Sequence, residues 1–373
     1  MKLSPVGHRA VVVAFAALLV TTVAVGAQSP SPVASAVPPV QLDGSWVPIA
    51  DAPIAGRYGQ AAAWTGTELL IWGGSPGPRS RNDTVTRRER GGAAYDPTTD
   101  MWRFIARAPI PNLPVQVAAW TGTELLVWGR PDRWRATRHE AIGAAYDPAT
   151  DTWRRLSDGP LTADGQVTGE WTGTELVVLD GITDSEPMDT THRLAAYDPA
   201  SRTWRRLPDL LASAPWSVGL AWTGADLYAL ASPNRGTSVL YRLDGDAWVP
   251  MPTPLDGLDT EPTMLWTGSE LYVHGARALD DPAAGTWRAA APVDGFGCGR
   301  AAWTGTVVLS GGGPASHPAA DAWLTMPASP DRSREYESVV WTGDRIIVWG
   351  GGDGSDRITL EPDGIAFIPA AAP

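Results

Sequence analysis

The fold is decided by the stretch Trp64-Thr65-Gly66-Thr67-Glu68-Leu69-Leu70-Ile71-Trp72-Gly73-Gly74. Its opening triplet, Trp-Thr-Gly, occurs seven times in the chain, each time with a short apolar run before it and another after it. A motif that returns every few tens of residues marks a repeat architecture, in which each copy is one structural unit. The other six copies begin at Trp120, Trp171, Trp222, Trp266, Trp303 and Trp341.

Each copy has the pattern of a β-hairpin. In the first copy, Ala61-Ala62-Ala63 precede the motif and Leu69-Leu70-Ile71 follow it, so two short apolar runs flank a turn that contains Gly66. Such runs, joined by a few residues that include glycine, are typical of paired strands. Glycine holds the same turn position in every copy, which favours a positive φ there. Runs this short argue against helices.

A second half-unit follows the hairpin and is clearest in the first three copies. In residues 94–102 a strand that carries Tyr95 leads into an Asp-Pro turn and then into a strand that carries Trp102. Residues 145–153 and 196–204 repeat this pattern. An aromatic strand, an Asp-Pro turn and a second aromatic strand predict another hairpin, so each unit supplies four strands.

These units resemble the kelch repeat. The resemblance rests on the double glycine after the second strand, the tyrosine of the third strand and the tryptophan of the fourth, and it covers residues 42–370. The motif spacings of 56, 51, 51, 44, 37 and 38 residues lie near the kelch period of about 50. In the fifth unit His274-Gly275 replaces the glycine pair, and we expect the tyrosine to be missing from the fifth and sixth units. The resemblance implies an all-β, seven-bladed β-propeller of four-stranded kelch-type blades, like the central domain of galactose oxidase.

The tryptophans are best explained by packing between blades. Fourteen of the 19 lie on repeat positions, and each indole could bury about 150 to 250 Å². Seven belong to Trp-Thr-Gly. The other seven end the second half-units, at Trp46, Trp102, Trp153, Trp204, Trp248, Trp287 and Trp323.

The start of the repeat region indicates how the ring closes. Trp46 lies in residues 42–48, which match residues 243–250 and precede the first Trp-Thr-Gly, whereas the seventh unit lacks a fourth-strand tryptophan. We predict that the N-terminal strand around Trp46 completes blade seven, which closes the ring and removes exposed sheet edges. The alternative is that residues 365–368 supply the last strand.

The N-terminal residues read as an export signal. In residues 1–27, Lys2, His8 and Arg9 lead into an apolar run that ends in small residues, as in a Sec-type signal peptide. The run is about 18 residues long, so an uncleaved N-terminal anchor is the alternative. Residues 28–41, rich in Pro, Ser and Ala, predict a linker, and residues 42–373 the propeller. In both cases we expect a secreted or otherwise extracytoplasmic propeller, and membrane contact only through a retained N-terminal segment.

Composition excludes some classes of partner. Without Lys2 and Arg9 the chain keeps 27 of its 29 basic residues and all 41 acidic ones, a net charge of −14. This argues against nucleic-acid binding, which needs a basic surface. The single cysteine, Cys298, permits no intrachain disulfide and would be a lone thiol in a secreted protein.

Strand direction alternates within a blade, so the connections divide between two faces. Turns such as Thr65-Gly66-Thr67 and residues 96–100 hardly vary, and we call their side the constant-turn face. The opposite side, the variable-loop face, carries the long second-to-third loops at residues 75–90, 130–140 and 181–191. Because binding residues gather on loops held by a rigid scaffold, it is the candidate functional face.

The first two variable loops carry Arg88, Arg133 and Trp134. Guanidinium groups with an indole could hold a carboxylate, a sulfate or an acidic sugar. The alternative is that these loops are solvated and carry charge for solubility only.

Blade-to-blade segments add polar and aromatic residues near the axis of the same face. Such a mixture suits recognition of a sugar or peptide, and it equally suits a purely structural ring of hydrogen bonds. We predict ligand contacts at Arg57, Tyr58, Trp216, Glu261, Arg300, Arg334, Tyr336 and Glu337.

The resemblance to galactose oxidase raises the question of catalysis. A copper-radical site needs two His, two Tyr and a Cys linked to a Tyr, but the histidines of the repeat region share no motif spacing. Glu261, Glu335 and Glu337 could supply paired carboxylates for glycoside or epimerase chemistry. Our leading hypothesis is a non-catalytic binding module for a glycan or an extracellular protein, with no metal and no cofactor. The alternative is a carbohydrate-active enzyme (oxidase, epimerase or glycosidase-like) with its site at the axial channel mouth.

Overall fold

The computed structural model describes residues 40–75, 91–111, 113, 115, 117–130, 141–163, 167–181, 189–213, 215–233, 237–251, 253, 255, 263–274, 278–289, 301–310, 315–320, 322–330, 337–352 and 362–370. These belong to one compact unit, residues 39–373. The expected signal or anchor (1–27) and nearly all of the expected linker lie outside the described residues. The regular secondary structure of the described part is all β-strand, apart from the three-residue 3-10 turn η1 (Pro318–Ala320).

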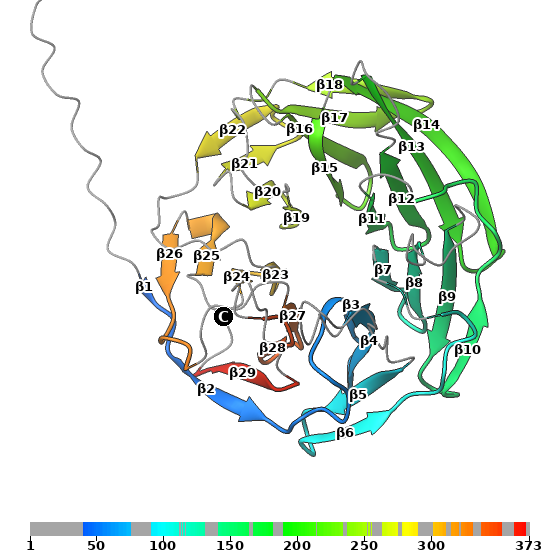
Figure 1. Cartoon of the computed structure of the whole chain (residues 1–373). Coiled ribbons are helices and arrows are strands. Elements are labelled where there is room, and N and C mark those ends of the chain that lie inside the picture. The colour runs from blue at the N-terminus through cyan, green and yellow to red at the C-terminus, as the bar shows by residue number, and fades with distance from the viewer. Residues whose placement is uncertain are drawn as a thin grey trace, which may run out of the picture. The chain divides into compact units, whose positions relative to one another are not determined.

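The strands form seven sheets arranged as a seven-bladed β-propeller (Figure 1), as predicted. Each blade has four antiparallel strands, and the first strand of each blade lies innermost. Blades one to three are β3 (Tyr58–Trp64), β4 (Leu69–Ser75), β5 (Gly92–Asp96) and β6 (Met101–Phe104); β7 (Val117–Trp120), β8 (Leu125–Gly129), β9 (Ile142–Asp147) and β10 (Thr152–Arg155); and β11 (Val167–Trp171), β12 (Leu176–Gly181), β13 (Asp189–Asp198) and β14 (Thr203–Ser213). Blades four and five are β15 (Pro215–Trp222), β16 (Leu227–Pro233), β17 (Val239–Asp244) and β18 (Ala247–Met251); and β19 (Thr263–Trp266), β20 (Leu271–His274), β21 (Ala278–Asp281) and β22 (Thr286–Ala289). Blades six and seven are β23 (Ala301–Trp303), β24 (Val308–Ser310), β25 (Ala315–His317) and β26 (Ala322–Thr325); and β27 (Ser338–Trp341), β28 (Ile346–Trp349), β29 (Gly364–Pro369) and β2 (Gly44–Ile49).

The core lies between blades. In β4, Leu69 and Ile71 pack in the cluster shared with blade seven, whereas Leu70 and Trp72 pack in the cluster shared with blade two. Successive side chains of a strand point to opposite faces of its sheet, and here both faces are covered. This is why the second-strand runs are apolar throughout rather than alternating. Seven such clusters, each shared by two neighbouring blades, complete the ring.

The N-terminal strand closes blade seven, which confirms the predicted closure. Strand β2 pairs antiparallel with β29, and Trp46 lies opposite Phe367. The two rings are 5.2 Å apart between centroids, and the Trp46 indole N–H donates to Pro327 O of blade six at 2.8 Å. The alternative closure is wrong, because residues 365–368 lie in β29, the third strand of the blade rather than the fourth.

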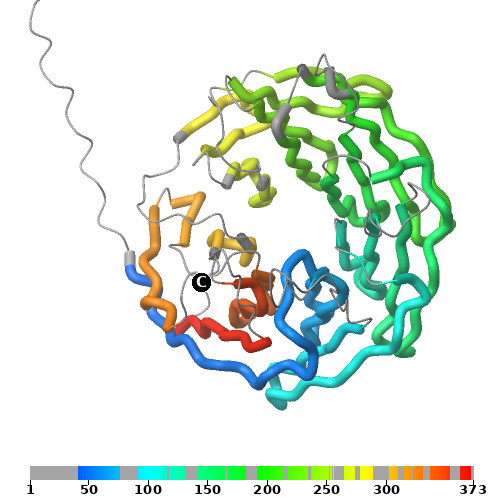
Figure 2. Tube along the Cα trace, in the orientation of Figure 1, coloured from blue at the N-terminus to red at the C-terminus, as the bar shows by residue number. Residues whose placement is uncertain are grey.

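Blade six has a fifth strand that the sequence analysis did not predict. Strand β1 (Val40–Gln41) pairs parallel with the outer strand β26, and Leu42 N donates to Thr325 O at 2.9 Å. Two residues assigned to the linker therefore pair with the propeller. Figure 2 shows the blue N-terminal tube running from the orange edge of blade six to the red strand of blade seven.

The third-strand tyrosine is rarer than the sequence suggested. Register places Tyr95, Tyr146 and Tyr197 at one equivalent position in blades one to three. The same position in blades four to seven holds Leu243, Asp280, Ser316 and Phe367. In blades five and six, where we expected the tyrosine to be missing, a second-strand tyrosine of the preceding blade, Tyr228 or Tyr272, joins the shared cluster instead.

We predict that Trp46→Ala weakens the propeller without changing its architecture. The substitution removes the contact with Phe367 and the hydrogen bond to blade six, and the free energy of unfolding should fall by about 3 kcal/mol. Urea unfolding of the purified protein measures this. The neighbouring, exposed Ser45 provides the control, because Ser45→Ala should shift stability by less than about 0.5 kcal/mol. Equal effects of the two substitutions would contradict the closing role of Trp46.

Candidate functional site

The described residues include part of the predicted site. Arg57, Tyr58 and Glu337 lie on the variable-loop side of blades one and seven, at the start of β3 and just before β27. Trp216 lies in β15 of blade four. The other predicted contacts fall outside the described residues, namely Arg88, Arg133, Trp134, Glu261, Arg300, Arg334 and Tyr336.

Arg57 binds the protein's own backbone. Its side chain is only 1% exposed. Its Nε donates to Ala55 O at 2.9 Å, and its Nη1 donates to Gly73 O at 2.9 Å and to Gly91 O at 3.3 Å. A buried guanidinium must be paired, and these carbonyls fix the entry to blade one against its second and third strands. For Arg57 this geometry matches the structural alternative, and contact with a ligand stays a prediction.

The double glycines hold the blade-to-blade segments. Gly73 and Gly74 have φ angles of 76° and 79°, a region that side chains disfavour. Gly74 N donates to Leu113 O at 3.1 Å, on the segment that leads to blade two, and Gly351 N donates to Arg57 O at 3.0 Å. A Cβ on Gly74 would lie 2.8 Å from Tyr58 O. The glycine pair therefore allows the close approach that orients the connections of this face.

A polar bridge links the inner strands of blades one and seven. Gln60 Nε2 donates to Ser338 Oγ at 2.8 Å, and both side chains are buried. Glu337, the residue before Ser338, is also buried. Sequence reasoning missed Gln60 and Ser338. The available signal was a polar residue in an otherwise small and apolar run before Trp-Thr-Gly.

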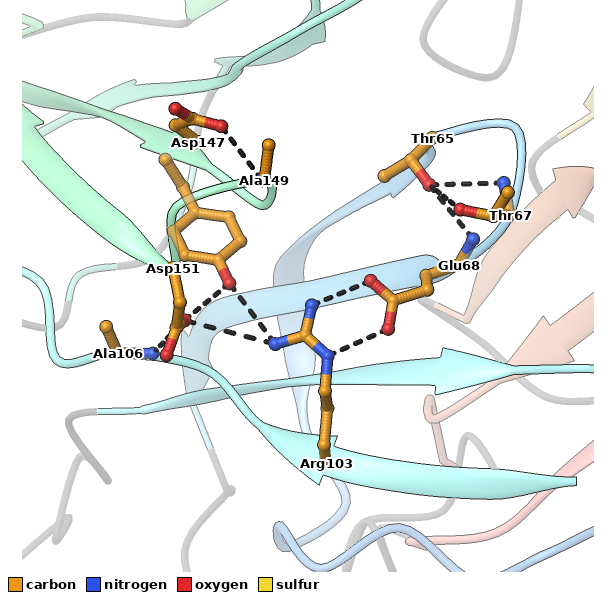
Figure 3. Close-up of polar contacts among 9 residues, drawn as sticks. Thr65, Thr67, Glu68, Arg103, Ala106, Asp147, Ala149 and Asp151 are labelled. Carbon is orange, nitrogen blue, oxygen red and sulfur yellow. Dashed lines mark hydrogen bonds and ion pairs between the residues drawn. The ribbon is translucent and has the colours of Figure 1, made fainter. Parts of the chain in front are cut away.

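On the constant-turn face, charged groups join neighbouring blades (Figure 3). Arg103 Nε and Nη2 donate to the two carboxylate oxygens of Glu68 at 2.8 and 2.7 Å, and Nη1 lies 3.4 Å from the hydroxyl of Tyr146 in blade two. That hydroxyl donates to Asp151 Oδ1 at 2.6 Å, which also accepts from Ala106 N at 2.8 Å. Burial and the bond to Asp151 raise the pKa of Tyr146 to about 12. Burial alone would raise the pKa of Asp151, but its hydrogen bonds hold it below its usual value.

The same network recurs around the ring. Arg154 donates to both oxygens of Glu124 at 2.8 and 2.5 Å and to the Tyr197 hydroxyl at 2.9 Å. Arg205 with Glu175, and Arg288 with Glu270, form the same two-bond pair. Tryptophans of the outer strands also link the blades. Each donates its indole N–H to a backbone carbonyl in, or just after, the outer strand of the preceding blade. The tryptophans that form this bond are Trp46, Trp102, Trp153, Trp204 and Trp248. These polar groups serve the scaffold.

For two buried ionisable groups, His192 and Asp280, the described residues supply no opposite charge. His192 in β13 is 3% exposed, and neither ring nitrogen has a hydrogen-bond partner among the described residues. Burial lowers its pKa to about 4, so the imidazole is neutral at pH 7. Asp280 in β21 is also buried, and burial, followed by the charges of Asp281 and Glu270, raises its pKa to about 6.

Within the described ranges no three His, Cys, Asp or Glu side chains gather as metal ligands would. Among these same residues, no helix has the length and apolar character to span a membrane.

The two-bond pairs should differ in strength with their exposure. The side chains of Arg154 and Glu124 are 20% and 22% exposed, whereas Arg205 is 57% exposed opposite Glu175. Because solvent screens the more exposed pair, a double-mutant cycle with alanine should give about 1 kcal/mol of coupling for Arg154 and Glu124 and about 0.3 kcal/mol for Arg205 and Glu175. Denaturant unfolding of both sets measures the couplings, and the reverse order would contradict this account.

His192 should make the fold sensitive to acid. The unfolded chain binds a proton on this residue near pH 6.5, whereas the native protein does so only near pH 4. Between these values the unfolded state holds more protons, so the stabilisation present above pH 6.5 is lost as the pH falls to 4, by about 3 kcal/mol. In His192→Phe this part of the pH dependence should disappear. An unchanged slope of unfolding free energy against pH in the variant would contradict the assignment.

No protein-family model matches the chain, and no curated protein is significantly similar to it. The fold is therefore established by the internal repeat and by the observed sheet order. Seven blades of four antiparallel strands, one of them extended by the parallel strand β1, are joined by seven shared cores and define the chain as a seven-bladed β-propeller.

Proposed function

We propose that this chain is a kelch-type propeller that acts outside the cytoplasm as a non-catalytic binding module, and that it recognises a glycan or an extracellular protein through its variable-loop face. The observation that carries the proposal is the difference between the two faces. On the constant-turn face, turns of nearly one length are tied into repeated pairs of arginine and glutamate. On the other face the second-to-third connection runs from Ser75 to Gly92 in blade one but only from His274 to Ala278 in blade five.

The kelch assignment is supported by the structural roles of the three features on which the resemblance rests. The double glycine binds the blade-to-blade segment. The third-strand tyrosine donates to the Asp of its turn, as Tyr95 does to Asp100 at 2.8 Å. The fourth-strand tryptophan binds the preceding blade, as Trp102 does at Ala50 O. Each feature therefore contributes to a junction that recurs within the ring.

The chemistry of the proposed ligand follows from the variable loops. Arginine pairs with carboxylates and sulfates through two parallel hydrogen bonds, and an indole offers an apolar face to a sugar ring. Arg88, Arg133 and Trp134 supply these groups in two adjacent loops. The extracytoplasmic location is supported by the signal-like pattern of residues 1–27.

Glycan arrays and pull-down experiments test this proposal with the double variant Arg88→Ala, Trp134→Ala. We expect binding to an acidic glycan or an acidic protein surface to fall at least tenfold, because both the ion pair and the stacking contact are lost. The matched control is Arg155→Ala, Phe104→Ala, which removes an exposed arginine and an exposed aromatic residue from outer strands. The control should bind as the unaltered protein does.

Two results would count against the proposal. Unchanged binding by the loop variant would remove Arg88 and Trp134 from the binding surface. Turnover by the purified protein, such as peroxide release from galactose after incubation with copper or hydrolysis of a glycoside, would favour the carbohydrate-active enzyme instead.

A further inference from the structure

Glu170 is an exception at a position that repeats in every blade. The residue directly before Trp-Thr-Gly lies near the end of the innermost strand and packs toward the following blade, as Ala63 and Ala119 show. In the six other blades this residue is apolar, at Ala63, Ala119, Ala221, Leu265, Ala302 and Val340. Blade three instead places the half-buried carboxyl group of Glu170 there, facing blade four.

The carboxyl group lies at the inner edge of blade four. Glu170 Oε1 accepts from Trp222 N at 3.3 Å. In the adjoining turn Thr223 N donates to Asp226 O, so Thr223 and Asp226 form a hydrogen-bonded pair. Hydrogen-bonded and non-hydrogen-bonded pairs alternate along an antiparallel ladder, so the next pair, Trp222 and Leu227, is non-hydrogen-bonded. The Trp222 N–H therefore points away from β16, toward the free edge of β15. That edge lines the centre of the propeller (Figure 1).

No positive charge within the described residues compensates Glu170. The bond from Trp222 N is its only polar contact within the described part of the chain. Burial raises its pKa to about 7, and the Trp222 bond offsets this only in part. The neighbouring strands β12 and β16 and the turns before them carry Asp180, Glu175, Asp226 and Tyr228, none of which is positively charged. Asp180, at the far end of β12, accepts from Ala163 N, Glu175 pairs with Arg205, and Tyr228 packs toward blade five.

An aromatic ring shares the gap with this carboxyl group. Glu170 lies opposite Val177 in the β11–β12 ladder, so their side chains are on the same face of the sheet. Val177 belongs to the cluster between blades three and four, and the half-buried indole of Trp222 packs against that cluster. A carboxylate beside an aromatic face is the combination that recognises an organic cation, through a charge-assisted hydrogen bond and a cation–π contact.

We propose that Glu170 and Trp222 form a binding site for the primary ammonium group of a ligand, at the inner edge of the constant-turn face and separate from the variable loops. The ammonium group donates to the carboxylate of Glu170 and lies against the indole of Trp222. The net charge of −12 favours the approach of a cation. Because a proton competes for the same carboxylate, binding of the ammonium group releases that proton.

Isothermal titration of the full chain with n-butylammonium tests the site. We expect saturable binding at pH 8 and about tenfold weaker binding at pH 6, because the apparent affinity falls with the fraction of protein whose carboxylate is ionised. Proton uptake by the buffer, measured in buffers of different ionisation enthalpy, should accompany binding near pH 7. The neutral analogue n-butanol should not bind.

Glu170→Gln should abolish binding of n-butylammonium, and it should fold, because the Gln carbonyl still accepts from Trp222 N. Asp246→Asn is the matched control, since it removes one exposed carboxylate from a constant-turn loop and should leave the affinity unchanged. No saturable binding at pH 8, equal binding by Glu170→Gln, or equal affinity at pH 6 and pH 8 would each overturn the proposal. Loss of glycan or protein binding in the variable-loop variant would leave this result unaffected.

Discussion

The structure depends on the burial of both faces of each second strand between neighbouring blades. A blade on its own would leave both apolar faces exposed, and each fully buried leucine or valine contributes about 1.5 to 3 kcal/mol only while its neighbour stays in place. Leu69, Leu70, Ile71 and Trp72 show the division, two side chains to each side. The blades are therefore stable as a ring rather than as separate sheets, and a loop can vary in length as long as these contacts are kept.

Hydrogen bonds on the two faces of the propeller fix the orientation of neighbouring blades, which the apolar contacts alone do not define. On the constant-turn face the contact of Arg103 with Tyr146 and the indole bonds link each blade to its neighbour. On the variable-loop face Gly74 and Gly351 hold the connecting segments, and Arg57 binds three backbone carbonyls. Packing alone would let neighbouring sheets slide, whereas hydrogen bonds of fixed geometry define one orientation. A fixed orientation gives the loops a rigid base.

The architecture could be predicted because the same strand pattern occurs in seven copies, so a chance resemblance in one copy would not change the assignment. The closing strand was also predictable. Trp46 marks a fourth strand that precedes the first unit, and the seventh unit lacks a fourth-strand tryptophan. Strand β1 could not be foreseen, since two residues in parallel pairing leave no periodic pattern. Likewise, Tyr228 and Tyr272 replace a missing ring from the adjacent blade, a compensation that only the packing reveals.

Most of the predicted contacts lie on loops, where residue type gives chemistry but no position, so Arg88 and Trp134 stay predictions. Glu170 breaks the apolar pattern before Trp-Thr-Gly in the sequence, but its contact with Trp222 N is seen only in the structure.

The pairing of β2 with β29 has a consequence for how the molecule is made. Gly44 lies opposite Pro369, so strands from the two ends of the repeat region must meet before blade seven exists. A polypeptide that is synthesised from its N-terminus exposes β2 long before β29 is available, and contacts this distant in sequence form slowly. Until then the apolar flank of blade one, including Leu69 and Ile71, is open to solvent. The interval between emergence of the first and the last strand is therefore when this protein is most vulnerable to aggregation and to proteases.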